Sequence, residues 1–330
     1  MAHATTTPRP GLDASVAAHA ATLGDELNRA RKGDPRGIHR ARTASRRLRE
    51  ALPVAAVAVP GVATDRARRD VRRLTRWLGR VRELDVALVE LNAAATRQSW
   101  NPVAVGAVER GLAAERARRL ADLVSRLDEV DAGRLQARLE AIAAGLSNDP
   151  LPRLAERALA RRLRQRAARL VAAIEDAGTV YIPERLHAAR IAAKKLRYTL
   201  ELARDAAGLR VGRLLGSLKR AQDVLGHLHD LQVLEGLVNA TATGPSGRAV
   251  ARHAPGMTRA LERACREQHA LFLSKRAALA SAARRVGGQV AGALVGHRPL
   301  VMKFDAAALP GPDVSPRVRH GLRSARRQTS

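Results

Sequence analysis

The sequence predicts an all-α protein made of two similar halves. Apolar residues recur at helical spacing along nearly the whole chain, and alternating, strand-like segments are almost absent. Aromatic residues make up only 2% of the chain, and an interior rich in Ala and Leu favours close packing of helices over sheets. In addition, two sequence motifs each occur twice at nearly the same separation, which indicates an internal duplication.

Helix-breaking residues separate the predicted helices. Gly33 is expected to end the first helix, and Asp34 is expected to cap the second helix, which starts with Pro35. The other breaks are expected at residues 101–102, 148–150, 178–179, 182–183 and 244–247. The predicted helices span residues 12–32, 36–58, 64–95, 103–127, 131–146, 153–177, 184–208, 211–240 and 254–286.

The two halves are predicted to be helical bundles at residues 12–148 and 149–286. Residues 1–11 are expected to be a flexible N-terminus. Residues 287–330 contain several prolines and glycines and end in a basic segment, so we expect a mostly disordered tail. This tail either adds affinity for polyanions or only keeps the protein soluble, and both interpretations stay open.

The first repeated motif covers residues 38–49 and returns at residues 186–197, with six of its twelve positions identical. On a helix, its histidine and cations form one stripe beside an apolar stripe that would face a core. Like charges at this spacing repel each other, so the stripe is costly without a bound anion. One copy would suggest a solvated surface, whereas two copies with the same histidine favour an anion-binding surface. The stripe residues are His39, Arg42, Arg46 and Arg49 in the first copy and His187, Arg190, Lys194 and Arg197 in the second.

The second motif covers residues 78–86 and returns at residues 225–233. Its copies are offset by 147 residues, against 148 for the first motif, and this agreement supports a duplication of the whole half. Glycine inside a helix costs about 1 kcal/mol. Gly79 and Gly226, which lie inside the two copies, are therefore expected to allow the close approach of a neighbouring helix.

The charge of the chain points to polyanionic partners. The chain has 59 Lys and Arg residues against 31 Asp and Glu residues, which gives a net charge of +28. A field of this size attracts polyanions and speeds their association. Only six of the 59 cations are lysine, and the planar fork of arginine suits phosphate oxygens.

Composition also argues against several classes of protein. No apolar stretch reaches the length of a transmembrane helix, and residues 1–10 lack an apolar signal core. The single cysteine, Cys265, excludes an internal disulfide framework and fits a reducing compartment. We therefore expect a cytoplasmic protein without a membrane partner.

The sequence predicts neither catalysis nor a metal site. It contains no nucleophile–base set and no phosphate-binding glycine loop. His227 and His229 diverge by about 200° on a helix, and no cysteine or carboxylate cluster completes a metal shell around them. We expect a binding protein without a cofactor.

Together, the repeated motifs resemble the conserved histidine α-helical domain, or CHAD, over residues 12–286. The most specific parts are the paired His-x-x-Arg-x-x-x-[Arg/Lys]-[Arg/Lys]-Leu-Arg helices and the paired Leu-Gly-x-x-x-[Asp/Glu] segments. The resemblance implies two four-helix bundles related by a pseudo-two-fold axis, with a basic central cavity between them. It also implies non-enzymatic binding of inorganic polyphosphate and association with polyphosphate granules. Because the sequence lacks the Glu-x-Glu-x-Lys segment of the triphosphate-tunnel domain that some members carry, we expect a stand-alone member.

The resemblance assigns polyphosphate binding to the residues at the motif positions. These are His39, Arg42, Arg46, Arg47, Arg49, His187, Arg190, Lys194, Lys195 and Arg197. The helices that precede the Leu-Gly segments are predicted to extend the surface with Arg72, Arg73, Arg76, Lys219 and Arg220. Asp85 and Asp230 are predicted to orient the arginines of the site.

The role of the motif histidines stays open. They either donate to bound phosphate, which would tighten binding below about pH 6.5, or bridge helices as neutral residues whose charge the nearby arginines disfavour.

The main alternative function is that of a nucleoid-associated, nucleic-acid-binding protein. No helix-turn-helix or RNA-binding signature occurs, and the tryptophans and tyrosines are too few and dispersed to form a stacking platform. Nucleic acid is therefore expected only as a weaker competitor. A third hypothesis, a phosphohydrolase acting on polyphosphate, predicts metal-dependent phosphate release. The sequence identifies no protein partner.

Overall fold

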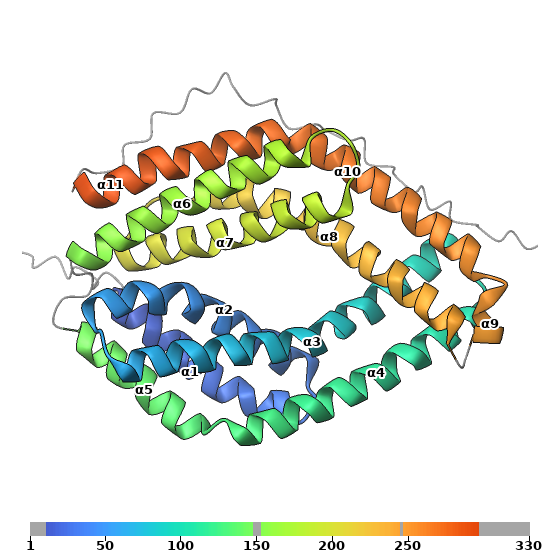
Figure 1. Ribbon diagram of the computed structural model, residues 1–330, viewed down its shortest axis with the longest axis horizontal. Coiled ribbons are helices and arrows are strands. Elements are labelled where there is room, and N and C mark those ends of the chain that lie inside the picture. Colours follow the sequence, from blue (N-terminus) through green and yellow to red (C-terminus); the bar gives the residue numbers. More distant parts are fainter. Residues whose placement is uncertain (1–10, 148–152, 245–246, 297–330) are drawn as a thin grey trace, which may run out of the picture. The chain divides into compact units, whose positions relative to one another are not determined.

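The computed structural model describes residues 11–147, 153–244 and 247–296, and every element in these ranges is helical (Figure 1). The all-α prediction is confirmed, and each predicted helix is present with ends that agree within a few residues. No helix in these ranges offers the long uncharged apolar stretch that a membrane crossing requires. The helices are α1 (Leu12–Arg31), α2 (Pro35–Ala58), α3 (Val62–Gln98), α4 (Pro102–Glu129), α5 (Ala132–Leu146), α6 (Arg153–Ala177), α7 (Pro183–Ala207), α8 (Gly212–Thr243), α9 (Gly247–Ala251), α10 (Ala254–Arg285), the π-helical η1 (Val286–Val290) and α11 (Ala291–Gly296).

Three of these segments, α9, η1 and α11, have no counterpart among the predicted helices. η1 and α11 continue the chain in helical form to Gly296, past the predicted start of the tail at residue 287. Val286, Val290 and Leu294 are buried, so this stretch packs as part of the fold. The predicted junction at residues 148–152 and the remainder of the predicted tail, residues 297–330, lie outside the described residues.

The predicted helix caps are present at two of the breaks. The side chain of Asp34 accepts a hydrogen bond from the Arg36 backbone N–H at 3.0 Å. Asn101 Oδ1 accepts from the backbone N–H groups of Val103 and Ala104 at 3.0 and 3.2 Å. These bonds satisfy backbone donors that have no partner inside the helix.

Each half buries the predicted apolar stripe of its His-motif helix. In the first half, α2 packs against α1 and α3, and α3 packs against α4 and α5; in the second, α7 packs against α6 and α8, and α10 packs against α6 and α8. Ile38, Leu48 and Leu52 of α2 are fully buried, as are Leu196 and Leu200 of α7. The cationic stripe beside each apolar stripe is thereby turned away from the interior of its own half.

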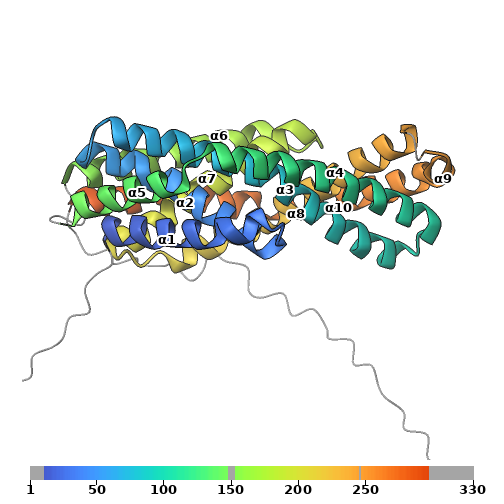
Figure 2. The same cartoon turned by 90° about the horizontal axis from the view of Figure 1, so that it is seen from below.

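The two halves contact each other at two places. At the first, α2 packs against α6 and α7, and α1 packs against α7. At the second, the C-terminal part of α3 and α4 meet α8, α9 and α10. Both views place α9 beside the ends of α4 and α10 (Figure 1 and Figure 2).

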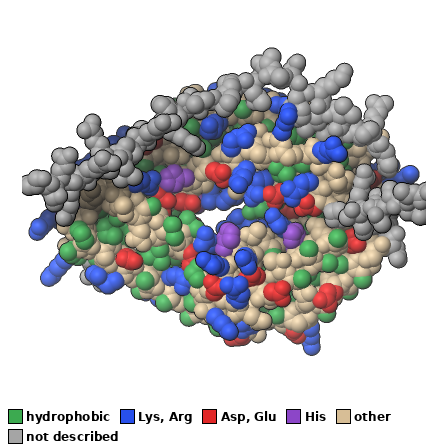
Figure 3. All heavy atoms as spheres, turned by 180° about the vertical axis from the view of Figure 1, so that it is seen from behind, with side chains coloured by type: hydrophobic (Ala, Val, Ile, Leu, Met, Phe, Trp, Pro, Cys, Tyr) green, Lys and Arg blue, Asp and Glu red, His purple; other side chains and the backbone are tan. Residues whose placement is uncertain are grey.

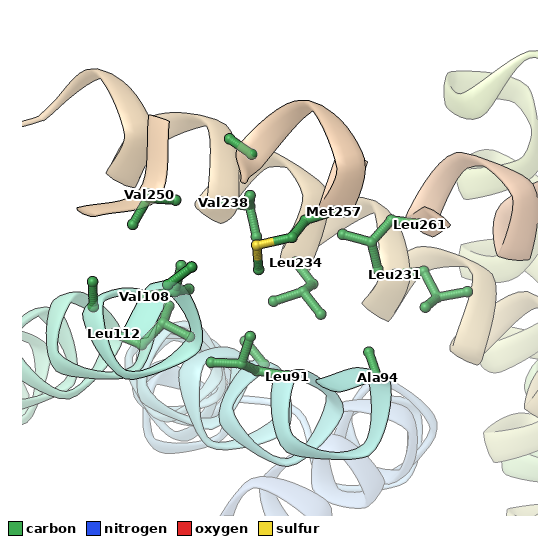
Figure 4. Packing of buried hydrophobic residues seen from close by; sticks show 14 of the residues in the cluster. Leu91, Ala94, Val108, Leu112, Leu231, Leu234, Val238, Val250, Met257 and Leu261 are labelled. Atoms are coloured by element: carbon green, nitrogen blue, oxygen red, sulfur yellow. The ribbon is translucent and has the colours of Figure 1, made fainter. Parts of the chain in front are cut away.

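The second contact is an apolar cluster that we call the inter-half core. Its residues include Leu91 of α3, Val108 of α4, Leu234 of α8, Val250 of α9 and Met257 of α10, and none of these is more than 2% exposed. Their side chains point toward one another across the contact (Figure 4). Burial of apolar surface is the main force that stabilises such a contact. The cluster therefore joins residues from both sides of the predicted boundary at 148.

The two motif glycines do not behave alike. A Cβ atom at Gly79 would lie 3.4 Å from Nε of Arg42, so this glycine leaves room for a side chain of the His-motif helix. A Cβ atom at Gly226 would meet nothing within 4 Å. The prediction of a close approach is wrong at Gly226.

Candidate anion-binding cavity

Four cations from the two His-motif helices come together where the halves face each other. α2 packs against α7, and this contact brings Arg42 and Arg46 of α2 near Arg190 and Lys194 of α7. Burial, and then the charge of Arg46, lower the pKa of Arg42 to about 9. Burial, and then the charge of Arg190, lower the pKa of Lys194 to about 6. We call these four residues the cationic quartet.

In the absence of an anion, the charges of the quartet are energetically unfavourable. The Nε atoms of Arg42 and Arg190 are buried and have no hydrogen-bond partner. Asp230 of α8 lies 3.8 Å from Arg190, which is too far for a direct hydrogen bond. Removing cations from water without pairing them costs free energy. A phosphate oxygen at this position would supply the missing acceptors.

A cavity of about 390 Å³ lies beside the quartet, between α2, α3, α6 and α7. Figure 3 shows an opening near the middle of one face, with Lys and Arg side chains, histidines and carboxylates gathered around it; the described lining of the cavity itself contains no histidine. Among the described residues, the cations that line the cavity are Arg46, Arg49, Arg68, Arg72, Arg162, Arg166, Arg169, Lys194 and Lys195. Five of these were predicted from the motifs, whereas Arg68 and the three α6 arginines were not.

A single carboxylate among the described lining residues, that of Glu50, organises one wall of this cavity. Glu50 is 7% exposed and accepts hydrogen bonds from Arg162 at 2.7 Å and from Arg166 at 3.2 Å. The hydroxyl of Thr199 donates to the same carboxylate at 3.2 Å. Glu50 therefore connects α2 of the first half with α6 and α7 of the second. The spacing of residues 162, 166 and 169, which places them on one helix face, was the sequence signal that could have identified the α6 arginines.

The motif histidines have different partners in the two halves. His187 Nδ1 lies 3.3 Å from His229 Nδ1, and the ring centroids are 4.7 Å apart. His39 makes no side-chain hydrogen bond within the described residues, and it faces the charge of Arg82 on α3. Burial lowers the pKa of His39 and of His187, and it lowers that of His229 to about 3. All three rings are therefore neutral at pH 7 in the unliganded protein.

Two of the predicted ligand residues are instead paired with one buried carboxylate, that of Glu201. Arg47 Nε lies 3.8 Å from Glu201. Arg197 donates to Glu201 and, at 2.6 Å, to Gln222. Arg47 Nε is buried without a hydrogen-bond partner, and neither arginine is among the described residues that line the cavity. The remaining predicted cations outside the cavity lining are exposed: Arg73, Arg76, Lys219 and Arg220.

The two predicted orienting carboxylates have different roles. The charge of Asp230 favours the protonated forms of Arg190 and Lys194, and its orienting role stays a prediction. Asp85 instead accepts a 2.7 Å hydrogen bond from Arg116 of α4. Arg116 also donates to the Gly33 backbone carbonyl at 2.9 Å, so this network holds α4 against the turn between α1 and α2.

A second cavity, of about 690 Å³, lies on the other side of the histidine pair. His187 and His229 line it together with Tyr181, Gln232 and Glu235. In the part of the chain that the structure describes, no group of three or more His, Cys, Asp or Glu side chains is arranged to hold a metal ion.

Comparison with known proteins gives one family and one fold. The family model of the CHAD domain matches residues 14–239. Among solved structures, the crystal structure of the CHAD domain from the plant Ricinus communis is similar with a TM-score of 0.57 and 20% sequence identity. The similarity covers 84% of this chain and 93% of that chain. No curated protein matches the sequence.

Proposed function

The chain belongs to the CHAD domain family, and on this premise we propose that it binds inorganic polyphosphate in the cavity beside the cationic quartet without reacting with it. The observation that carries the proposal is the meeting of Arg42, Arg46, Arg190 and Lys194, which come from two helices and outnumber the acidic groups that act on them, Asp230 and Glu83. A linear polyphosphate carries about one negative charge per unit and offers acceptor oxygens along its whole length. Guanidinium groups bind such oxygens with short, charge-assisted hydrogen bonds.

The proposed architecture consists of two four-helix bundles related by internal duplication. α4 and α5 would act as one bent helix in the first bundle, and α10, η1 and α11 would act as one in the second. The helix contacts support this correspondence, because α2 packs against α6 as α7 packs against α1. In such an arrangement the two copies of the cationic stripe face one shared cavity.

The cavity suits polyphosphate better than nucleic acid. Single-stranded nucleic acid is usually held by aromatic rings on which bases stack. Tyr198 is the only aromatic residue among the described lining residues, and Arg197 lies over its ring at 4.5 Å. The lining therefore offers many phosphate-binding groups and no free stacking surface.

Titration with long-chain polyphosphate tests the proposal. In roughly 150 mM salt, the protein should bind tightly, and the affinity should fall steeply as salt is added. The Ala variant of all four quartet residues should lose this binding while retaining its helix content. A control variant that also loses four basic side chains replaces four exposed cations that have no ion pair in the described residues: Arg36, Arg66, Arg110 and Arg263.

Two results would contradict the proposal. One is an equal loss of affinity in the quartet and control variants, because the net charge alone would then explain binding. The other is binding to duplex DNA that is as tight as binding to polyphosphate, which would favour the nucleic-acid alternative.

The proposed cellular role is association with polyphosphate granules in the cytoplasm. A fluorescent fusion should form foci in cells that contain polyphosphate and should become diffuse in cells without it. The proposal of a non-enzymatic role predicts no release of phosphate from polyphosphate in the presence of Mg²⁺ or Mn²⁺. Metal-dependent release would instead support the phosphohydrolase hypothesis.

A further inference from the structure

One position of the cationic quartet carries a lysine where the other copy of the motif carries an arginine. Arg46 in the first copy corresponds to Lys194 in the second, in a chain where only six of 59 cations are lysine. An arginine stays charged at any physiological pH, whereas a lysine can lose its proton and become a nucleophile. This exchange gives the cavity a reactive group in one half only.

The surroundings of Lys194 favour its neutral amine. Arg190 of its own helix and Arg46 and Arg42 of α2 act on it with like charge, and Asp230 of α8 opposes them more weakly. Lys194 makes no hydrogen bond or ion pair within the described residues. Because burial and the three guanidinium groups lower its pKa to about 6, most of the amine is unprotonated at pH 7. A neighbouring cation activates lysine nucleophiles in enzymes in the same way.

We propose that Lys194 is a covalent modification site that is acylated by acyl phosphates, the mixed anhydrides of a carboxylic acid and phosphate. This inference rests on the proposed function, because the guanidinium groups that bind polyphosphate also hold the phosphate group of the acyl donor. The Nζ lone pair forms a bond to the carbonyl carbon, and the bond from this carbon to the bridging oxygen breaks. Inorganic phosphate leaves with the electron pair of that bond, the nitrogen loses one proton to solvent, and Lys194 becomes a neutral amide.

The cavity supplies what this reaction requires besides the nucleophile. Arg46 lines the cavity together with Lys194, and Arg190 is near both residues. These guanidinium groups stabilise the negative charge that develops on the departing phosphate. The amide product cannot take up the proton that a bound polyanion would otherwise give Lys194, so acylation weakens polyphosphate binding.

The test is a comparison of acetylation rates within the full-length protein. The protein is incubated with acetyl phosphate at pH 7, digested with a protease that cleaves after glutamate, and analysed by mass spectrometry. Cleavage after Glu184 and Glu201 places Lys194 and Lys195 in one peptide, where fragment ions distinguish them. Lys219, which is exposed on α8, serves as the internal reference.

Lys194 should be acetylated at least about tenfold faster than Lys219 at pH 7, because its pKa of about 6 leaves most of its amine unprotonated. Its rate should rise with pH and then level off, at a pH set by the pKa of about 6 and moved upward by the charge of the bound acyl phosphate. The Lys194→Arg variant should lose the fast adduct, and the Lys32→Arg variant, at an exposed position outside the described cavity lining, should retain it. Equal rates at Lys194 and Lys219 would overturn the acylation proposal and would leave polyphosphate binding to be judged by titration.

Added polyphosphate separates this inference from the proposed function. If saturating long-chain polyphosphate slows the acetylation of Lys194 but not that of Lys219, both proposals are supported. If Lys194 reacts fast and polyphosphate does not slow it, the acylation site stands, and the cavity is not where polyphosphate binds.

Discussion

The two His-motif helices, α2 and α7, present cations at corresponding positions of their middle turns and make different contacts at their ends. Arg42 and Arg46 of α2 approach Arg190 and Lys194 of α7 in a nearly matched arrangement. The first turn of the motif differs. His187 contacts His229. His39 makes no side-chain hydrogen bond within the described residues, and it faces the charge of Arg82.

The last turn of the motif differs more. Arg49 lines the cavity, whereas its counterpart Arg197 is held by Glu201 and a glutamine. The next position is Glu50 in α2, which receives the α6 arginines, and Tyr198 in α7. A sequence repeat fixes the direction in which a side chain leaves its helix, but the neighbouring helices decide whether that side chain meets a ligand or a carboxylate.

The largest effect is expected at Glu50. Glu50→Ala leaves Arg162 and Arg166 without their acceptor, and breaking a buried ion pair from one side costs about 3 kcal/mol. Tyr198→Phe changes the corresponding position of α7 and should alter the free energy of unfolding by less than about 0.5 kcal/mol. Denaturant unfolding of both variants measures the difference, and equal losses would show that Glu50 does not connect the halves.

The matched pair Arg49 and Arg197 should separate binding from stability. Arg49→Ala removes a cavity cation, so the polyphosphate affinity should fall about tenfold with little change in stability. Arg197→Ala leaves Glu201 with a weaker partner, so the free energy of unfolding should fall by about 1–2 kcal/mol, and the affinity should change by less than about twofold. The reverse pattern would mean that ligand binding breaks the contact between Arg197 and Glu201.

The pH dependence of polyphosphate binding should depend on Lys194, which occupies the position of Arg46 in the second copy of the motif. The pKa of Lys194 is about 6 in the unliganded protein, and a bound polyanion raises it, so binding takes up protons above pH 6. Affinity should therefore fall as pH rises from 6.5 to 8.5, by about three- to fivefold per unit. The Lys194→Arg variant should show a smaller change of affinity with pH, and the Arg46→Lys variant should show a larger one. If the affinity of the Lys194→Arg variant changes with pH as much as that of the wild-type protein, the proton taken up on binding goes to another group.

The smallest effects are expected from exchanging the partners of the motif histidines. Arg82→His should weaken polyphosphate binding, and His229→Arg should strengthen it, each by about two- to threefold, because each changes one charge beside a motif histidine. Titration at pH 7 in constant salt compares the two variants. Changes of the same sign would indicate that the histidine contact with His187, and not charge, dominates.

The sequence predicted the parts of this molecule that depend on local order. Helical periodicity and caps such as Asp34 and Asn101 place the helices to within a few residues, and the repeat identifies the cationic quartet. The capture of Arg197 by Glu201 and the gathering of the α6 arginines around Glu50 depend on which helices pack together. No pattern along one helix contains that information.

The inter-half core also affects how the chain folds while it is being synthesised. Its α3 and α4 residues, including Leu91 and Val108, are synthesised before Leu234 and Met257 exist to cover them. The nascent first half therefore presents an apolar face to solvent until α8 to α10 leave the ribosome, and such exposure favours aggregation. A fragment that ends near residue 147 would keep this face permanently uncovered.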